Sequence, residues 1–314
     1  MPALAPSTAV RWLLAPATSA PPRGNAIALA ALRILLGLLW LYNVSWKRPP
    51  DFGRSSGSGL YGFTKDAVDH PVFPPYSWVV ETFVLPNFVA FGWMVLVVET
   101  LLAVLLLTGT LVRVAALVGV GQSLAIGLSV AQTPGEWPWS YWLMIGAHVV
   151  LVLCASGAVL AVDGARAHRR TDAVTTAPAR LVQLWALVVA GAGVVALLLS
   201  IGASPLAARG EALGGSGLSI SLGSYNLVGA IVLLMIAALM FAAASLGRSA
   251  LATAAAAISV LAALSLYLQL QRTDPWLGGN NTSAAFFLCA ALISAMLAGG
   301  LDRKTSEREV HANG

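Results

Sequence analysis

Long apolar runs, separated by short polar connections, dominate the sequence. A membrane-spanning helix needs about 20 mostly apolar residues. Eight segments satisfy this: about 26–44, 87–108, 111–131, 140–162, 181–202, 226–247, 249–271 and 283–301. The connections at Gly109 and at Arg248 are very short, so the helices on either side of each must form antiparallel hairpins. We therefore predict an all-α fold, a polytopic membrane bundle of about eight transmembrane helices.

Two connections are much longer than the others, residues 45–86 and 203–225, and each follows the first helix of a set of four. Residues 99–113 resemble residues 236–248, and the fourth and eighth helices end alike, at Asp163 and Asp302. This pattern favours a degenerate four-helix repeat. The domains that we expect are an N-terminal segment (1–25), a four-helix membrane domain (26–165), a basic loop (166–180), a second four-helix membrane domain (181–301) and a tail (302–314).

The composition agrees with a membrane location. Hydrophobic residues make up 58% of the 314-residue chain and charged residues only 10%, whereas soluble domains are about 25% charged. Most of the surface is therefore expected to face lipid. The formal charge of +5 is modest and spread over the loops, so it indicates contact with lipid head groups and not nucleic-acid binding.

Lysine and arginine also predict the orientation. With a cytoplasmic N-terminus, the inner segments hold eleven of these cations and the outer segments six, and the densest cluster lies in the short 166–180 loop. Positive charge favours the cytoplasmic side. We therefore expect a multi-pass protein of the plasma membrane with both termini cytoplasmic. Residues 78–86 in the first long connection are too short to span and predict an interfacial or re-entrant helix.

Charges at membrane depth are costly and often functional. Arg33 lies roughly 10 Å above the inner end of the first helix, and Glu99 roughly 13 Å above that of the second, at about 1.5 Å per residue. Their matching depths predict a buried Arg33–Glu99 ion pair. Such a pair either only holds the four helices together or lines a polar cavity that binds a small anion or a quinone head group.

Further polar residues accompany this pair. Gln122 falls near mid-membrane, and His148 lies nearer the outer side, where it is either satisfied by a neighbour or hydrogen-bonds a quinone. Cys154 is either a small apolar filler or a redox group. Lys47, just outside the first helix, is either a snorkelling lysine or a group that attracts an anion. Asp163 is expected to form a surface ion pair, with Arg113 or Arg166.

Other site types receive little support. The two cysteines and four histidines are far apart, so we expect no metal site and no disulfide framework. No flavin or haem site is apparent either. Asn280 and Asn281 match glycosylation acceptor patterns, which we interpret as coincidence in this composition.

Several of these residues together resemble the DoxX/DoxD family. They are Arg33 and Gly37 on the first helix, Trp46-Lys47 after it, Glu99 on the second helix, Leu107-Thr108-Gly109 before Arg113, and the stretch from Tyr141 to Asp163. The resemblance covers about residues 26–165 and is greatest to the DoxD-type small subunit of thiosulfate:quinone oxidoreductase. It implies a quinone-linked oxidation of a small sulfur compound, with quinone as co-substrate and a redox partner subunit.

Two features depart from the family pattern. Ser45 and Trp46 precede Lys47 where the family usually has a glycine, and the C-terminal half consists of four further helices. The leading hypothesis is a redox-associated membrane subunit, in which Arg33, Lys47, Glu99, Gln122 and His148 surround a quinone or sulfur anion. The alternatives are a non-catalytic scaffold or accessory protein, and a small-molecule permease. Homo-oligomers are compatible with each.

Overall fold

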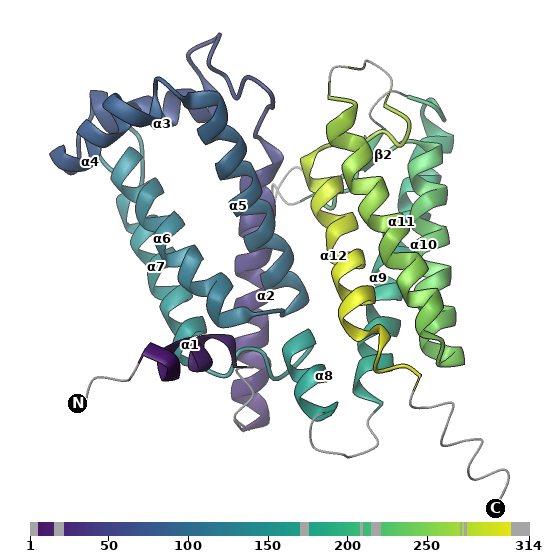
Figure 1. Cartoon of the computed structure of the whole chain (residues 1–314). Helices are drawn as coiled ribbons and strands as arrows, with labels where there is room; N and C mark the ends of the chain where they lie inside the picture. Colours follow the sequence, from purple (N-terminus) through teal and green to yellow (C-terminus); the bar gives the residue numbers. More distant parts are fainter. Residues whose placement is uncertain are drawn as a thin grey trace, which may run out of the picture.

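The computed structural model describes residues 6–15, 22–169, 176–207, 210–214, 221–270, 272 and 275–302. These residues are almost entirely helical (Figure 1). The elements of the first half are α1 (Pro6–Leu14), α2 (Arg23–Ser45), α3 (Gly59–Asp69), α4 (Pro74–Val79), the π-helix η1 (Val80–Val84), α5 (Phe88–Thr108), α6 (Val112–Val130), α7 (Pro138–Leu153) and α8 (Val162–Arg169). Those of the second half are α9 (Ala177–Gly202), β1 (Glu211–Ala212), β2 (Ser224–Tyr225), α10 (Leu227–Leu246), α11 (Ser249–Leu268) and α12 (Asn281–Ala298).

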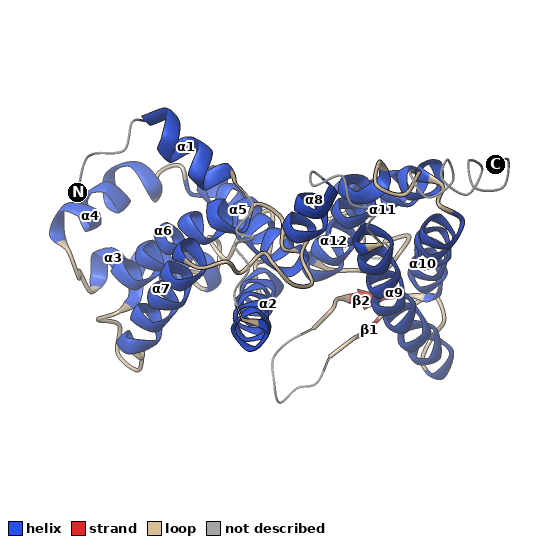
Figure 2. Cartoon of the chain, turned by 90° about the horizontal axis from the view of Figure 1, so that it is seen from below, coloured by secondary structure: helices blue, strands red, loops and turns tan. Residues whose placement is uncertain are grey.

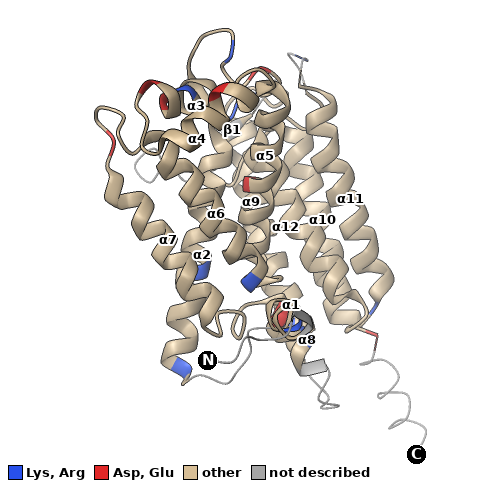
Figure 3. Ribbon diagram, turned by 60° about the vertical axis from the view of Figure 1, so that its left-hand side comes forward, with Lys and Arg blue, Asp and Glu red and all other residues tan. Residues whose placement is uncertain are grey.

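Within the described chain, seven helices are long and apolar enough to cross a membrane: α2, α5, α6, α9, α10, α11 and α12. They coincide with seven of the eight predicted segments. Charged residues gather at the two ends of the bundle, and few lie between (Figure 3). The prediction of an all-α membrane bundle is confirmed at this level.

The remaining predicted span, 140–162, is wrong in its second half. The apolar helix α7 has 16 residues and ends at Leu153, and helix resumes only at Val162. The carbonyls of Val159 and Leu160 accept hydrogen bonds from Arg33 at 3.2 and 2.9 Å. These carbonyls are therefore directed at a side chain and do not continue the helical ladder.

The long helices form two groups. The first group consists of α2, α5, α6 and α7, and the second of α9–α12. Within the first group, α2 and α5 lie nearer the second group than α6 and α7 do (Figure 2). Helix α12 contacts both α2 and α5 and so joins the groups. Its Ala285 and Cys289 pack in one buried cluster with Leu36 and Trp40 of α2. Small residues at such contacts allow helices to approach closely where lipid supplies no hydrophobic driving force.

Equivalent caps recur in the two halves. Helix α5 ends at Gly109 and α10 at Gly247, both left-handed, with φ of 67° and 68°. The Asp163 carboxylate accepts hydrogen bonds at 3.0 and 3.1 Å from two backbone N–H groups at the start of α6. Asp302 accepts one at 2.8 Å from the Ser249 N–H at the start of α11. In each half an acid near the end of the unit therefore caps the third long helix.

Short helices cover both ends of the first group. Helices α3 and α4 lie across one end, here called the α3 end. Helix α1 lies across the other end, where α8 is also found and which is here called the α8 end (Figure 1). The side chains of Trp78 and Phe83 are 58% and 55% exposed. Their position in the predicted interfacial segment agrees with exposure of apolar side chains to the membrane boundary.

Candidate functional site

A cavity of about 750 Å³ lies within the first group of helices. Helices α2, α5 and α6 form its walls, the segment at the start of α7 contributes to its rim, and α3, α4 and η1 cover it. Its surface is mostly apolar, with contributions from Leu60, Phe63, Phe91, Val95 and Ile126. A π-helical turn such as η1 is rare and frequently occurs at functional sites.

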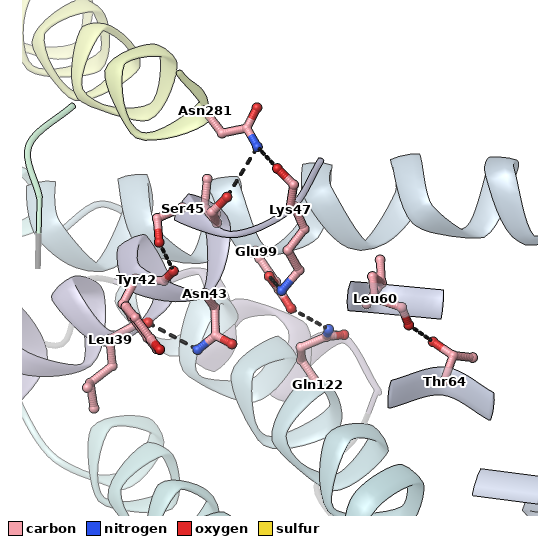
Figure 4. Close-up of polar contacts among 11 residues, drawn as sticks. Leu39, Tyr42, Asn43, Ser45, Lys47, Leu60, Thr64, Glu99, Gln122 and Asn281 are labelled. Carbon is pink, nitrogen blue, oxygen red and sulfur yellow. Dashed lines mark hydrogen bonds and ion pairs between the residues drawn. The ribbon is translucent and has the colours of Figure 1, made fainter. Parts of the chain in front are cut away.

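Three polar side chains meet on the wall of this cavity (Figure 4). Lys47 forms an ion pair with Glu99, and both side chains are only 1% exposed. Gln122 Nε2 donates a hydrogen bond to Glu99 Oε1 at 3.2 Å. The Lys47 ammonium also lies 3.8 Å from the centroid of the Trp46 ring. A buried cation is thus matched by one carboxylate, so the cluster has no net charge.

Each member of the cluster comes from a different part of the chain. Lys47 follows the C-terminal end of α2, Glu99 lies within α5, and Gln122 lies within α6. The second half contributes through Asn281, the first residue of α12. Its Nδ2 donates to the carbonyls of Val44 and Lys47 at 3.2 and 2.8 Å (Figure 4). Asn281 therefore holds the backbone that carries the Lys47 side chain.

A second polar region lies on the same cavity. The Tyr76 hydroxyl and the Ser129 hydroxyl are hydrogen-bonded at 3.0 Å, and Tyr141 donates to the Glu136 carboxylate. All four residues line the cavity. The sequence pattern did not indicate these residues as members of the site. Only the closeness of Glu136 and Tyr141 in sequence could have indicated them, because Tyr76 and Ser129 are 53 residues apart.

The cavity is not sealed from its surroundings. Tyr42 and Met94, which line it, are 41% and 54% exposed. These residues belong to α2 and α5, the helices that form its walls. The cavity therefore has partly exposed walls, whereas the Lys47 and Glu99 side chains on it are buried.

The predicted Arg33–Glu99 ion pair is wrong. Arg33 is fully buried, but its guanidinium donates to the carbonyls of Leu107, Val159 and Leu160 at 2.9 to 3.3 Å, and also to that of Leu106. These carbonyls lie at the C-terminal end of α5 and in the segment after α7. Carbonyl groups at a helix end carry partial negative charge, so Arg33 is stabilised at the α8 end without a carboxylate in contact.

His148 is not a cavity residue either. Its Nε2 accepts a hydrogen bond from the Trp40 indole at 2.9 Å, and its Nδ1 donates to the Met144 carbonyl at 2.8 Å. Both ring nitrogens are therefore used within the protein, in the neutral tautomer with a proton on Nδ1. The imidazole is fully buried, so the interpretation of a histidine satisfied by its neighbours holds and the quinone-binding one is wrong.

The predicted surface ion pair of Asp163 with Arg113 or Arg166 is also not formed. Asp163 instead caps α6, as described above, and burial raises the pKa of its carboxyl group, whereas hydrogen bonds from backbone N–H groups act in the opposite direction. Arg113 donates to the Trp12 carbonyl at 2.9 Å and stacks on its ring. It therefore attaches α1 to the bundle.

Cys154 does not belong to the polar cluster. It is a free, half-buried thiol at the C-terminal end of α7 and does not line the cavity. Among the described residues, no three His, Cys, Asp or Glu side chains are placed to share a metal ion. The structure thus brings together Lys47, Glu99 and Gln122 from the predicted set, and places Arg33, His148 and Cys154 elsewhere.

Comparison of the chain with models of protein families, with curated proteins and with solved structures gives no match. The resemblance to the DoxX/DoxD family therefore depends on the individual residues given above.

Proposed function

We propose that this chain is an integral membrane protein that binds a lipophilic molecule with a neutral, hydrogen-bonding head group, and that a quinone is the class that fits best. The observation that carries this proposal is the Lys47–Glu99–Gln122 cluster on the wall of a large apolar cavity. Small-molecule sites commonly combine apolar walls with a few placed polar groups.

The charge of the cluster favours a quinone over a small sulfur anion. Glu99 already neutralises Lys47, so an anion entering the cavity would meet no net positive charge and would lose its hydration. Quinone carbonyls need only hydrogen-bond donors. Lys47 and Gln122 carry N–H donors, and the Tyr76 hydroxyl lies on the same cavity.

We further propose a redox-associated role of the DoxX/DoxD type, in which a partner subunit oxidises a small sulfur compound and this chain connects it to the quinone pool. The order of Arg33, Trp46, Lys47 and Glu99 along the chain supports the resemblance. In the same proposal, the chain lies in the plasma membrane with both termini cytoplasmic, as the distribution of cations favours.

The two halves are proposed to be a degenerate repeat. The equivalent caps by Asp163 and Asp302, and the left-handed glycines that end α5 and α10, support this relationship. In the second half, the described spanning helices contain no Lys, Arg, Asp or Glu except Arg180 near the start of α9. Ligand binding is therefore assigned to the first half.

The test is binding of a short-tailed quinone to the full chain in lipid nanodiscs, followed by quenching of tryptophan fluorescence, to which Trp46 on the cavity contributes. Lys47→Met combined with Glu99→Gln removes the ion pair without leaving one charge unpaired. We expect about tenfold weaker binding, the size of effect for hydrogen bonds that involve a charged group. Ser259→Ala, a buried hydroxyl of α11, is the matched control and should bind as the original protein does.

Equal affinity in the double variant would show that the quinone does not use this cluster. Lack of binding to the original protein would favour the scaffold alternative. Thiosulfate-dependent quinone reduction, assayed with candidate partner subunits, tests the redox role separately.

A further inference from the structure

A second, smaller recess lies at the α3 end, between the two halves of the molecule. Its volume is about 130 Å³. The segment that follows α2 forms one side, and the connection from α11 to α12 forms the other. Its lining includes Lys47, Arg48, Gln269, Arg272 and Asn281.

The charged residues in the described lining of this recess are all cations. Arg48 and Arg272 line it from opposite halves, and both are exposed. Lys47 contributes its backbone region, since its ammonium is paired with Glu99 in the cavity. Among the described lining residues there is no carboxylate. Arg48 and Arg272 both line this small recess, so the described part of its wall produces a local positive potential.

The scaffold of the recess is held by hydrogen bonds. Asn281 is bonded to the carbonyls of Val44 and Lys47, so one side is attached to the other (Figure 4). The Trp276 N–H donates to Gln269 Oε1 at 3.0 Å. The Arg272 guanidinium lies 5.9 Å from the Trp276 ring centroid. The hydrogen bonds of Asn281 thereby join the segment that carries Arg48 to the start of α12.

We propose that this recess binds one phosphate-type oxyanion. Arginine presents a planar fork of N–H donors that matches tetrahedral oxyanions, and bonds between two charged groups are stronger than neutral ones. The volume accommodates a single such group. The oxyanion comes either from a lipid head group, since the neighbouring Trp276 is 63% exposed as boundary tryptophans are, or from solution as free phosphate. Lys47 lines both this recess and the quinone cavity, but Arg48 and Arg272 do not line the cavity, so the oxyanion site does not rest on the proposed function.

The experiment uses the full chain in detergent, with the exposed arginines changed singly to glutamine. Native mass spectrometry measures retention of phosphatidylglycerol against phosphatidylcholine, and calorimetry measures binding of inorganic phosphate. Arg48→Gln and Arg272→Gln should each weaken binding of the oxyanion about tenfold. Arg54→Gln is the matched control, because Arg54 is an exposed arginine in the connection after α2 that does not line the recess. Unchanged thermal midpoints establish that the variants fold.

Selective retention of phosphatidylglycerol, lost in Arg48→Gln and Arg272→Gln, supports the site and identifies a lipid head group. Binding of inorganic phosphate with the same dependence supports the site with a free anion. Equal effects of all three substitutions would show only a diffuse surface charge and would overturn the proposal. So would the absence of any preference for phosphatidylglycerol together with no binding of phosphate.

Discussion

Two buried cations, Arg33 and Lys47, are stabilised by different chemistry only 14 residues apart (47 minus 33). Lys47 has a carboxylate partner in Glu99. Arg33 instead distributes its donors over four backbone carbonyls. A fork of donors can satisfy several carbonyls at once, whereas an ammonium is a compact point charge. The site with four carbonyl acceptors therefore suits an arginine, and the site with a single carboxylate suits a lysine.

The Lys47–Glu99 pair allows a test of stability that does not depend on any ligand. Lys47→Met alone leaves the Glu99 carboxylate buried without its cation, and we expect a loss of about 3–5 kcal/mol in the free energy of unfolding. Adding Glu99→Gln should restore most of that loss, because the remaining amide is neutral. Thermal unfolding of the two variants and the original protein in detergent measures both effects. Equal midpoints for the single and double variants would contradict the ion pair.

The sequence identified Lys47, Glu99 and Gln122 as polar candidates but paired Glu99 with the wrong cation. Depth arithmetic treats consecutive helices as level with one another. In the structure Arg33 reaches the carbonyls at the very end of α5, whereas Lys47 meets Glu99 in the middle of that helix. The axial offset between α2 and α5 follows from side-chain packing, and hydrophobic periodicity carries no signal for it.

At the scale of elements, α6 and α7 are packed through a close approach at Gly119. A Cβ atom at this position would overlap the His148 imidazole, whereas nothing lies within 4 Å of one at Gly121. The histidine has little freedom to move, because Trp40 and Met144 hold both of its nitrogens. The glycine is thus required by the neighbouring helix and not by the local backbone.

Gly119→Ala should therefore lower the free energy of unfolding by about 1–3 kcal/mol, the usual cost of overpacking. Gly121→Ala, on the same helix, should be neutral or stabilise by up to about 1 kcal/mol, because alanine favours helix over glycine. Thermal midpoints of the two variants provide the comparison. A larger loss for Gly121→Ala would contradict the described packing of α6 on α7.

Asn281 connects α12 to the end of α2, and its effect is expected on the site as well as on stability. Asn281→Ala removes both hydrogen bonds that hold the Lys47 backbone, so we expect weaker quinone binding as well as a lower thermal midpoint. Asn226→Ala is a suitable control. Asn226 donates to the carbonyls of Pro275 and Trp276 within the second half, at 3.3 and 3.2 Å. If the two variants lose equal stability and neither loses affinity, Asn281 does not position the site.

At the scale of the whole molecule, the apolar runs were sufficient to predict the all-α bundle and seven of its spans. They failed beyond residue 153, where the sequence remains apolar but the chain leaves the helix to meet Arg33. Hydropathy indicates which residues are apolar. It carries no information on which backbone carbonyls a side chain distant in sequence will hydrogen-bond. The cavity could not be predicted either, because six stretches of the chain that are far apart in sequence form it.

The proposed orientation predicts which end of the molecule is accessible from outside the cell. A cysteine introduced at the exposed Ser56, in the connection after α2, should react in intact cells with a maleimide that cannot cross membranes. One introduced at the exposed Thr176, next to the basic loop, should react only after the membrane is opened. The half-buried Cys154 is replaced by alanine in both. The reverse pattern of labelling would show that the termini lie outside.

The contacts of Arg33 also constrain how the chain is made. The carbonyls of Val159 and Leu160 that it needs are synthesised 126 and 127 residues later. Until they emerge, a helix containing an arginine has to be held by the insertion machinery or kept at the membrane surface, because lipid offers the guanidinium no acceptors. Helix α2 is translated before α5 and α7, and we expect it to reach its final place only after both have entered. Ribosome-bound chains that stop before residue 159 should expose α2 to crosslinkers that full-length chains resist.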